Sequence, residues 1–199
     1  MKRLGLFLGV LVPVLYYAAV FGAASTWPGY SHVTQYASEL GSAAAPHPEY
    51  FNWPIMGAGV CAILSSLGFF AALRERGSGF LPAALSAVCI IAWGVAFVMG
   101  GWFHMPNPLH NAFGIALAVQ VAPLFMLMGL TKAHAPTLKL LLTVTFFAAL
   151  ALILIMFNVG HPNLVTSHNV GLWQRAYSFA SIPWIGLAAL MLMGRPKAR

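Results

Sequence analysis

The sequence has few charged side chains and no aspartate. Charged residues make up 7% of its 199 residues, whereas a soluble domain carries about 25%. Three glutamates, at positions 39, 49 and 75, supply all of the acidic charge. A soluble domain of this size needs a charged surface, so the composition excludes one. It also excludes a disordered chain, because disordered segments are poor in apolar residues and rich in charge.

Cysteine is nearly as scarce. Cys61 and Cys89 are the two cysteines, and both lie inside apolar runs. Two such residues exclude a disulfide scaffold and a zinc site made of cysteines. The net charge of +7 arises from missing acids rather than from a Lys/Arg patch, so no nucleic-acid partner is expected. A membrane protein with several spans is what remains.

Long apolar runs fill most of the chain, and 60% of the residues are hydrophobic. A spanning helix needs about 20 apolar residues, because it rises roughly 1.5 Å per residue across a core of roughly 30 Å. Six segments reach this length, at residues 4–24, 53–73, 80–100, 110–130, 138–158 and 173–193. We expect an all-α integral membrane protein, a six-transmembrane-helix bundle forming a single domain over residues 1–199. A cleaved signal peptide is the alternative for the first segment, but its length favours a retained span.

Lysine and arginine are distributed unevenly among the connections. Nine lie at the termini, in the second connection or in the fourth, and only Arg175 lies on the opposite side. Positively charged connections stay in the cytoplasm, so we expect both termini there. Six of the seven histidines and two of the three glutamates then face outward. Any functional site is therefore expected at the outer face.

The predicted spans contain few polar side chains, which argues against a transport channel. Gln120 lies near the middle of the fourth span. Polar side chains at this depth commonly hydrogen-bond across helices. We therefore expect Gln120 to bond to a neighbouring helix rather than to contact a substrate.

The first outer connection, residues 25–52, is the longest. Within it, residues 30–41 predict a short interfacial helix, with Ser31 able to cap its start and Gly41 able to end it. His32, Gln35 and Glu39 are spaced three and four residues apart, so they would share one face of this helix.

Three short motifs carry a resemblance to a known family. Residues 30–41 contain Tyr-Ser-His and Ser-Glu-Leu-Gly, residues 110–114 read His-Asn-Ala-Phe-Gly, and residues 171–175 read Gly-Leu-Trp-Gln-Arg. With these motifs the chain resembles the DUF998 family of small multi-pass prokaryotic membrane proteins. Members often carry an acid before the His-Asn pair, and residues 103–109 contain none. The resemblance implies six spans in a prokaryotic cell (inner) membrane, but no settled activity. It points to four residues: Ser38, Glu39, His110 and Arg175.

These residues lead to a hypothesis of a polar pocket that binds, and in its fuller form processes, a lipid or other amphiphilic small molecule. Glu39 would act as general acid or base near His110, and Ser38 would be the nucleophile, although no residue is placed to activate it. Arg175 would hold an anionic group such as a lipid phosphate. The ligand-binding set is completed by His32, Gln35 and Trp173. Glu39 and Arg175 are expected to meet directly, through one water or through His110, and a purely structural ion pair is the alternative.

Two other readings stay open. The histidines His104, His110, His161 and His168 could converge on a metal ion, or two histidines could hold a haem iron. The chain could also be a structural or accessory subunit without a site of its own. The sequence names no cofactor, leaves the oligomeric state open, and does not decide whether a reaction is catalysed.

Overall fold

The computed structural model describes residues 1–194, without the side chains of residues 112 and 113. The described chain is all-helical, as expected, and six of its helical segments are long and apolar enough to cross a membrane. Arg195, Lys197 and Arg199, which belong to the predicted orientation signal, lie outside the described residues. The elements in chain order are α1 (Lys2–Ser25), η1 (Ala37–Gly41), α2 (Glu49–Glu75), α3 (Phe80–Trp102), η2 (Pro108–Leu117), α4 (Ala118–Gly129), α5 (Pro136–Met156), α6 (Val170–Ser181) and α7 (Pro183–Met193).

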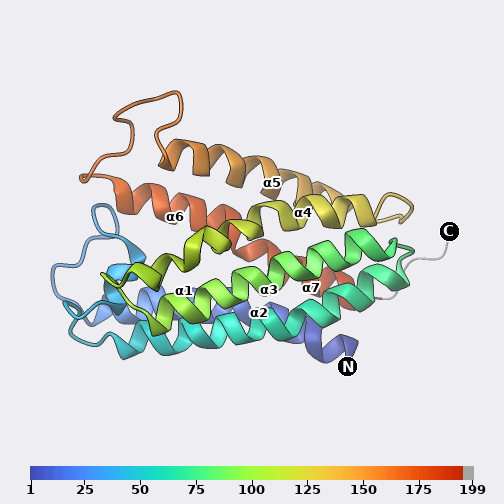
Figure 1. Ribbon diagram of the computed structural model, residues 1–199, viewed down its shortest axis with the longest axis horizontal. Helices are drawn as coiled ribbons and strands as arrows, with labels where there is room; N and C mark the ends of the chain where they lie inside the picture. Colours follow the sequence, from blue (N-terminus) through green and yellow to red (C-terminus); the bar gives the residue numbers. More distant parts are fainter. Residues whose placement is uncertain (195–199) are drawn as a thin grey trace.

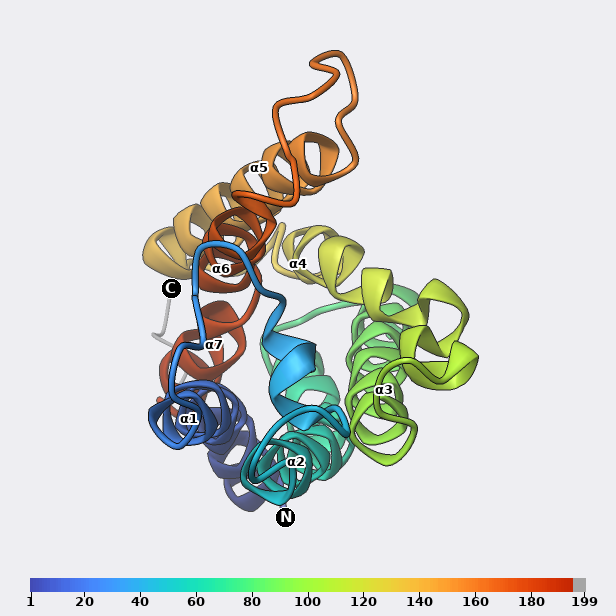
Figure 2. The same cartoon turned by 90° about the vertical axis from the view of Figure 1, so that its left-hand side faces the viewer.

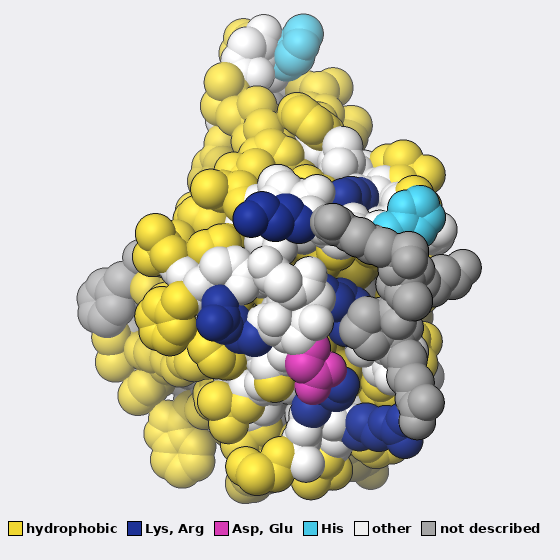
Figure 3. Space-filling model, turned by 90° about the vertical axis from the view of Figure 1, so that its right-hand side faces the viewer, with side chains coloured by type: hydrophobic (Ala, Val, Ile, Leu, Met, Phe, Trp, Pro, Cys, Tyr) yellow, Lys and Arg dark blue, Asp and Glu magenta, His cyan; other side chains and the backbone are white. Residues whose placement is uncertain are grey.

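The helices run between two ends of an elongated bundle (Figure 1). One end, here called the loop end, carries the connections 26–48, 103–107 and 157–169. The other, here called the basic end, carries the N-terminus and the connections 76–79 and 130–135. Figure 2 looks onto the loop end and shows η1 over the middle of the bundle, with α5 at the periphery. Figure 3 looks onto the basic end, where Lys and Arg side chains gather.

Two of the spans are interrupted, and the break in the sixth lies directly before Pro183, one of the prolines whose position predicts a kink or a helix start. The fourth begins as the 3-10 helix η2, with Pro108 in its first turn and the Asn107 side chain accepting a hydrogen bond from the Leu109 amide at 2.9 Å. The sixth consists of α6 and α7, which meet at Ile182. Pro183 follows the break, and a proline has no N–H to continue the ladder of α6.

Glycines let the first three helices approach closely. A Cβ atom added at Gly59 of α2 would lie 2.5 Å from the Gly94 carbonyl oxygen of α3, and one added at Gly94 would lie 2.7 Å from the Gly59 oxygen. Between α1 and α2, a Cβ at Gly5 would lie 2.9 Å from the Gly68 nitrogen. Helices in lipid associate by such close packing, because lipid tails are as apolar as the helix surfaces.

A polar bond joins the two interrupted spans. Gln120 of α4 donates from Nε2 to the hydroxyl of Tyr177 on α6. This is the interhelical role expected for Gln120 from its depth in the span, and that expectation is confirmed.

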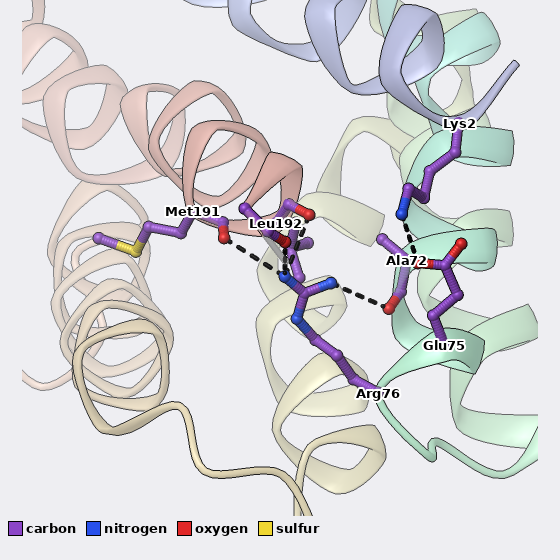
Figure 4. A network of polar contacts seen from close by, with 7 residues as sticks. Lys2, Ala72, Glu75, Arg76, Met191 and Leu192 are labelled. Atoms are coloured by element: carbon purple, nitrogen blue, oxygen red, sulfur yellow. Dashed lines mark hydrogen bonds and ion pairs between the residues drawn. The ribbon is translucent and has the colours of Figure 1, made fainter. Parts of the chain in front are cut away.

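The basic end is closed by side chains that satisfy helix-terminal carbonyl groups. Arg76, just after α2, donates to the carbonyl oxygens of Leu192 and Gly194 at 3.1 and 2.8 Å, at the end of α7 (Figure 4). Lys2 forms an ion pair with Glu75 beside it. The last carbonyls of a helix have no partner within it, so Arg76 both caps α7 and ties it to α2.

The glycine contact between α2 and α3 gives a testable expectation. Gly59→Ala should lower the thermal unfolding temperature in detergent, because the two backbones must separate, and overpacking of this kind costs about 1–3 kcal/mol. Gly57→Ala on the same helix is the matched control, since its Cβ would meet only Leu15 at 3.7 Å. A helical alanine there should leave stability equal or higher. Equal behaviour of the two variants would contradict the packing.

Candidate functional site

The first connection at the loop end is not the continuous helix that the sequence predicted over residues 30–41. Ser31 does cap a first turn, since its Oγ accepts from the Val33 and Thr34 amides at 3.3 and 3.2 Å. The chain then becomes extended at Tyr36, with ψ of 149°, and turns again as η1. The prediction was therefore right about the cap and wrong about the helix.

The reason lies in α6, which takes the carbonyl groups that a helix would use internally. The Val33 carbonyl accepts from the Leu172 amide at 2.9 Å, and the Gln35 carbonyl accepts from Arg175 Nη1 at 2.7 Å. The backbones come so close that a Cβ at Gly171 would lie 2.4 Å from the Gln35 oxygen. Glycine at position 171 is what allows the connection to dock on α6.

Arg175 is buried at the centre of this docking, with 8% of its surface exposed. Besides the Gln35 carbonyl, its Nη1 donates to Gln174 Oε1 at 3.2 Å, and its Nη2 donates to the Tyr30 hydroxyl. The guanidinium carbon lies 5.7 Å from the centre of the Tyr30 ring, within the range of a cation–π contact. Its Nε has no partner among the described residues. The described hydrogen-bond partners of the guanidinium are thus neutral carbonyl, amide and hydroxyl groups, and none of them is a carboxylate.

Glu39 does not pair directly with Arg175, and His110 does not bridge them, which corrects these two versions of the expected meeting of the charges. Glu39 accepts from the Tyr36 amide at 2.7 Å and from Gln35 Nε2 at 3.1 Å. Gln35 lies between the charges, with its carbonyl bonded to Arg175 and its side-chain amide bonded to Glu39. Because Gln35 bonds to both residues in this way, it separates the Glu39 carboxylate from the Arg175 guanidinium.

Beside this network, the loop end contains a cavity of about 630 Å³. Its wall comes from α1, α2 and α3, and its rim comes from η1, the third connection with η2, and α6. Aromatic and aliphatic side chains provide most of the wall, and hydroxyl, amide and imidazole groups lie among them. The described lining residues are Tyr16, Tyr36, Ala37, Ser38, Phe51, Ile55, Ala96, Phe97, Gly100, Met105, Pro106, Asn107, Pro108, His110, Asn111, Ala116 and Gln174.

His110 lines the cavity with one ring nitrogen fixed. Its Nδ1 lies 3.0 Å from both the Gly100 and the Phe103 carbonyl oxygens, at the end of α3. Carbonyl oxygens only accept, so Nδ1 carries the hydrogen. In the neutral imidazole, Nε2 is then a lone-pair acceptor with no bond to a described residue. The two carbonyls that His110 satisfies are among those that a helix terminus leaves free.

Gln174 also lines the cavity, and sequence reasoning missed it. Its Oε1 accepts from the Ala37 amide at 2.7 Å and from Arg175. This leaves the Nε2 amide group as a donor without a bond to a described residue. The available signal was its place immediately before Arg175, within the motif of residues 171–175.

The remaining predicted site residues divide into two groups. Ser38 lines the same cavity as His110, with its Oγ donating to Met105 Sδ at 3.1 Å. His32 and Trp173 are not among the residues that line the cavity. The His32 ring packs on Tyr30, and burial, with a smaller effect of the Arg175 charge, lowers the pKa of its imidazole. Gln35, Glu39 and Arg175 are also not among the described lining residues, but Glu39 and Arg175 bond to the lining residues Tyr36 and Gln174.

The four-histidine metal site expected at His104, His110, His161 and His168 is not assembled. Among the described residues, no group of three or more His, Cys, Asp or Glu side chains could hold a metal ion. His104, His161 and His168 are exposed in connections, while His110 is turned to the end of α3. The connection that carries His161 and His168 projects away from the bundle (Figure 2). Histidines in separate connections come together only where further contacts hold those connections in place, and the described structure provides no such contacts for these residues.

Comparison with known proteins gives one match. The family model described as "Protein of unknown function (DUF998)" matches residues 10–191, which is most of the chain. No curated protein and no solved structure matches the chain.

The contacts of Arg175 predict unequal costs for its loss and for that of Glu39. Arg175→Lys should lower stability strongly, because one ammonium group cannot reproduce the planar contacts to Gln35 and Tyr30, and a charged hydrogen bond contributes about 1.5–3 kcal/mol. Glu39→Gln should cost less, since an amide oxygen can still accept from the Tyr36 amide.

Thermal unfolding and proteolysis of the connection 26–48 would measure both variants. Arg175→Lys should expose that connection to cleavage, whereas Glu39→Gln should not. Equal losses in the two variants would show that the charges act as a pair after all.

Proposed function

The chain belongs to the DUF998 family, and from that premise we propose that this multi-pass membrane protein binds a lipid or another amphiphilic small molecule in the cavity at its loop end. The cavity itself is the observation that carries the proposal. Its volume of about 630 Å³ lies within the range of about 300–1,000 Å³ for small-molecule sites.

The lining has the two-part chemistry that an amphiphile requires. Phe51, Ile55 and Phe97 offer apolar surface, and Tyr16 stacks on Phe97 with ring centres 5.7 Å apart. His110 and Gln174 offer polar groups that the protein does not use itself. A ligand with an apolar chain and a polar head would satisfy both parts at once.

The proposal is one of binding rather than of catalysis. Ser38 and His110 share the cavity, but the Ser38 hydroxyl donates to the sulfur of Met105. Glu39, the third residue expected to act in catalysis, is bonded to the Tyr36 amide and to Gln35. The described contacts therefore support a pocket without an activated nucleophile.

We further propose that the loop end faces outward from a prokaryotic cell membrane and that the basic end is cytoplasmic. The grouping of Lys and Arg at one end supports this orientation (Figure 3). The ligand would then enter from the outer leaflet, where membrane lipid is the available partner.

Filling the cavity tests the binding proposal. Ala96→Phe on α3 places a ring in the cavity and should abolish the co-purification of a lipid or amphiphile, measured by mass spectrometry of extracts from purified protein. Ala116→Phe on η2 is a second variant at the same cavity. Ala151→Phe on the exposed face of α5 is the control and should retain the ligand. Wild-type protein without any specifically retained amphiphile would overturn the proposal, as would retention in both cavity variants.

Orientation has its own test. In a background with Cys61 and Cys89 replaced by alanine, single cysteines at His47 and Thr131 should behave oppositely toward a membrane-impermeant thiol reagent added to whole cells. Both residues are exposed. Position 47 should be labelled and position 131 should not. The reverse pattern would invert the proposed topology.

A further inference from the structure

We propose that the ligand of this cavity is an uncharged amphiphile whose head group carries a hydroxyl, such as a monoacylglycerol, with the hydroxyl donating to Nε2 of His110 and a head-group oxygen accepting from Nε2 of Gln174. This inference rests on the proposed function and narrows it to a chemical class. It replaces the anionic ligand that the sequence favoured for Arg175.

The described wall of the cavity is uncharged. None of the described lining residues is a Lys, Arg, Asp or Glu. An ion taken into such a cavity loses its hydration without gaining a direct partner, and this costs several kcal/mol as an order of magnitude. A neutral head group avoids that cost.

Arg175 is a cation bonded to the lining residue Gln174, but its own contacts are made elsewhere. Its two terminal NH₂ groups donate to the Gln35 and Gly171 carbonyls, the Tyr30 hydroxyl and Gln174 Oε1, while its Nε is buried without a described partner. Only 8% of its surface is exposed, and Arg175 is not among the described residues that line the cavity. Glu39 is bonded to the same Gln35 and supplies an opposite charge behind the rim. Arg175 is therefore a positioning residue for Gln174 and does not serve as an anion receptor.

Two lining side chains present hydrogen-bonding groups that the described protein does not use. His110 is held with Nδ1–H on two carbonyls, so in the neutral imidazole Nε2 is an acceptor and needs a donor from the ligand. Gln174 is held through Oε1 on the Ala37 amide, so it offers donors and needs an acceptor. A hydroxyl group supplies both functions in one atom, and an ester next to it supplies a further acceptor. A carboxylate or a fully ionised phosphate group is an acceptor only and would leave Nε2 of the neutral His110 unmatched.

Affinity comparison with three probes of one chain length tests the class. The probes are 1-oleoylglycerol, which is neutral with hydroxyls, methyl oleate, which is neutral without them, and oleoyl lysophosphatidic acid, which is anionic and keeps one glycerol hydroxyl. The third probe therefore tests the effect of charge and the second tests the effect of the hydroxyl. Native mass spectrometry or competition in detergent should rank 1-oleoylglycerol first on the wild-type protein. The margin should be about tenfold or more, since one matched hydrogen bond is worth about that factor.

Two substitutions assign the contacts. Gln174→Glu keeps an oxygen for the Ala37 amide and for Arg175 but removes the amide donor, so the protein should stay folded and lose about tenfold in affinity for 1-oleoylglycerol. His110→Phe removes the acceptor and should reduce the preference for 1-oleoylglycerol over methyl oleate. His104→Phe, at an exposed histidine of the connection that precedes η2, is the control and should change neither.

The outcomes separate this inference from the function on which it rests. Tighter binding of lysophosphatidic acid, or equal binding of methyl oleate, would overturn the hydroxyl-bearing neutral class while leaving a cavity that binds amphiphiles. Unchanged affinity in a folded Gln174→Glu variant would likewise overturn it. Failure of all three probes to bind, together with no retained amphiphile in the wild type, would overturn the proposed function itself.

Discussion

The buried guanidinium of Arg175 is the contact on which the loop end depends. It draws the Gln35 carbonyl and the Tyr30 hydroxyl onto α6 and so fixes the first connection against the bundle. The neighbouring Gln174 is held by the same guanidinium and binds the Ala37 amide at the start of η1. Because η1 forms part of the cavity rim, the position of this one side chain determines where the rim lies.

A second constraint comes from the membrane, which offers no water to free carbonyl groups where helices stop or break. The protein meets it with side chains from other elements. His110 satisfies carbonyls at the end of α3, and Arg76 satisfies those at the end of α7. These two side chains have different effects at the loop end and at the basic end. Arg76 closes the basic end, whereas His110 keeps a free ring nitrogen beside a cavity.

The sequence predicted the parts of the fold that depend on local composition. The length of the apolar runs was enough to predict the six spans, and the depth of Gln120 in its span was enough to predict its interhelical hydrogen bond. Prediction from the sequence failed where backbone groups form hydrogen bonds with elements that are distant in the chain. The periodicity of residues 30–41 favours a helix, but α6 captures the carbonyls of Val33 and Gln35. The same capture leaves Gln35 between Glu39 and Arg175, so counting charges gave a direct ion pair that the described contacts do not include.

The site could be predicted only in part, because it also depends on contacts between elements that are distant in the chain. Ser38 and His110 were chosen from short motifs, and the structure places both on one cavity. No local pattern reveals the cavity itself, because its wall joins residues as far apart as Tyr16 and Gln174. Nor could spacing show that the histidines of the connections would stay apart, since loops set no fixed direction for their side chains.

The central claim is that the loop end holds a neutral amphiphile. An experimental structure of the protein in a lipid nanodisc supplied with 1-oleoylglycerol tests it most directly. The account predicts density for one acyl chain beside Phe97, with the head-group oxygens within about 3.2 Å of His110 Nε2 and Gln174 Nε2, as hydrogen bonds require. A cavity that contains only water, or that is closed by its own side chains, would contradict it.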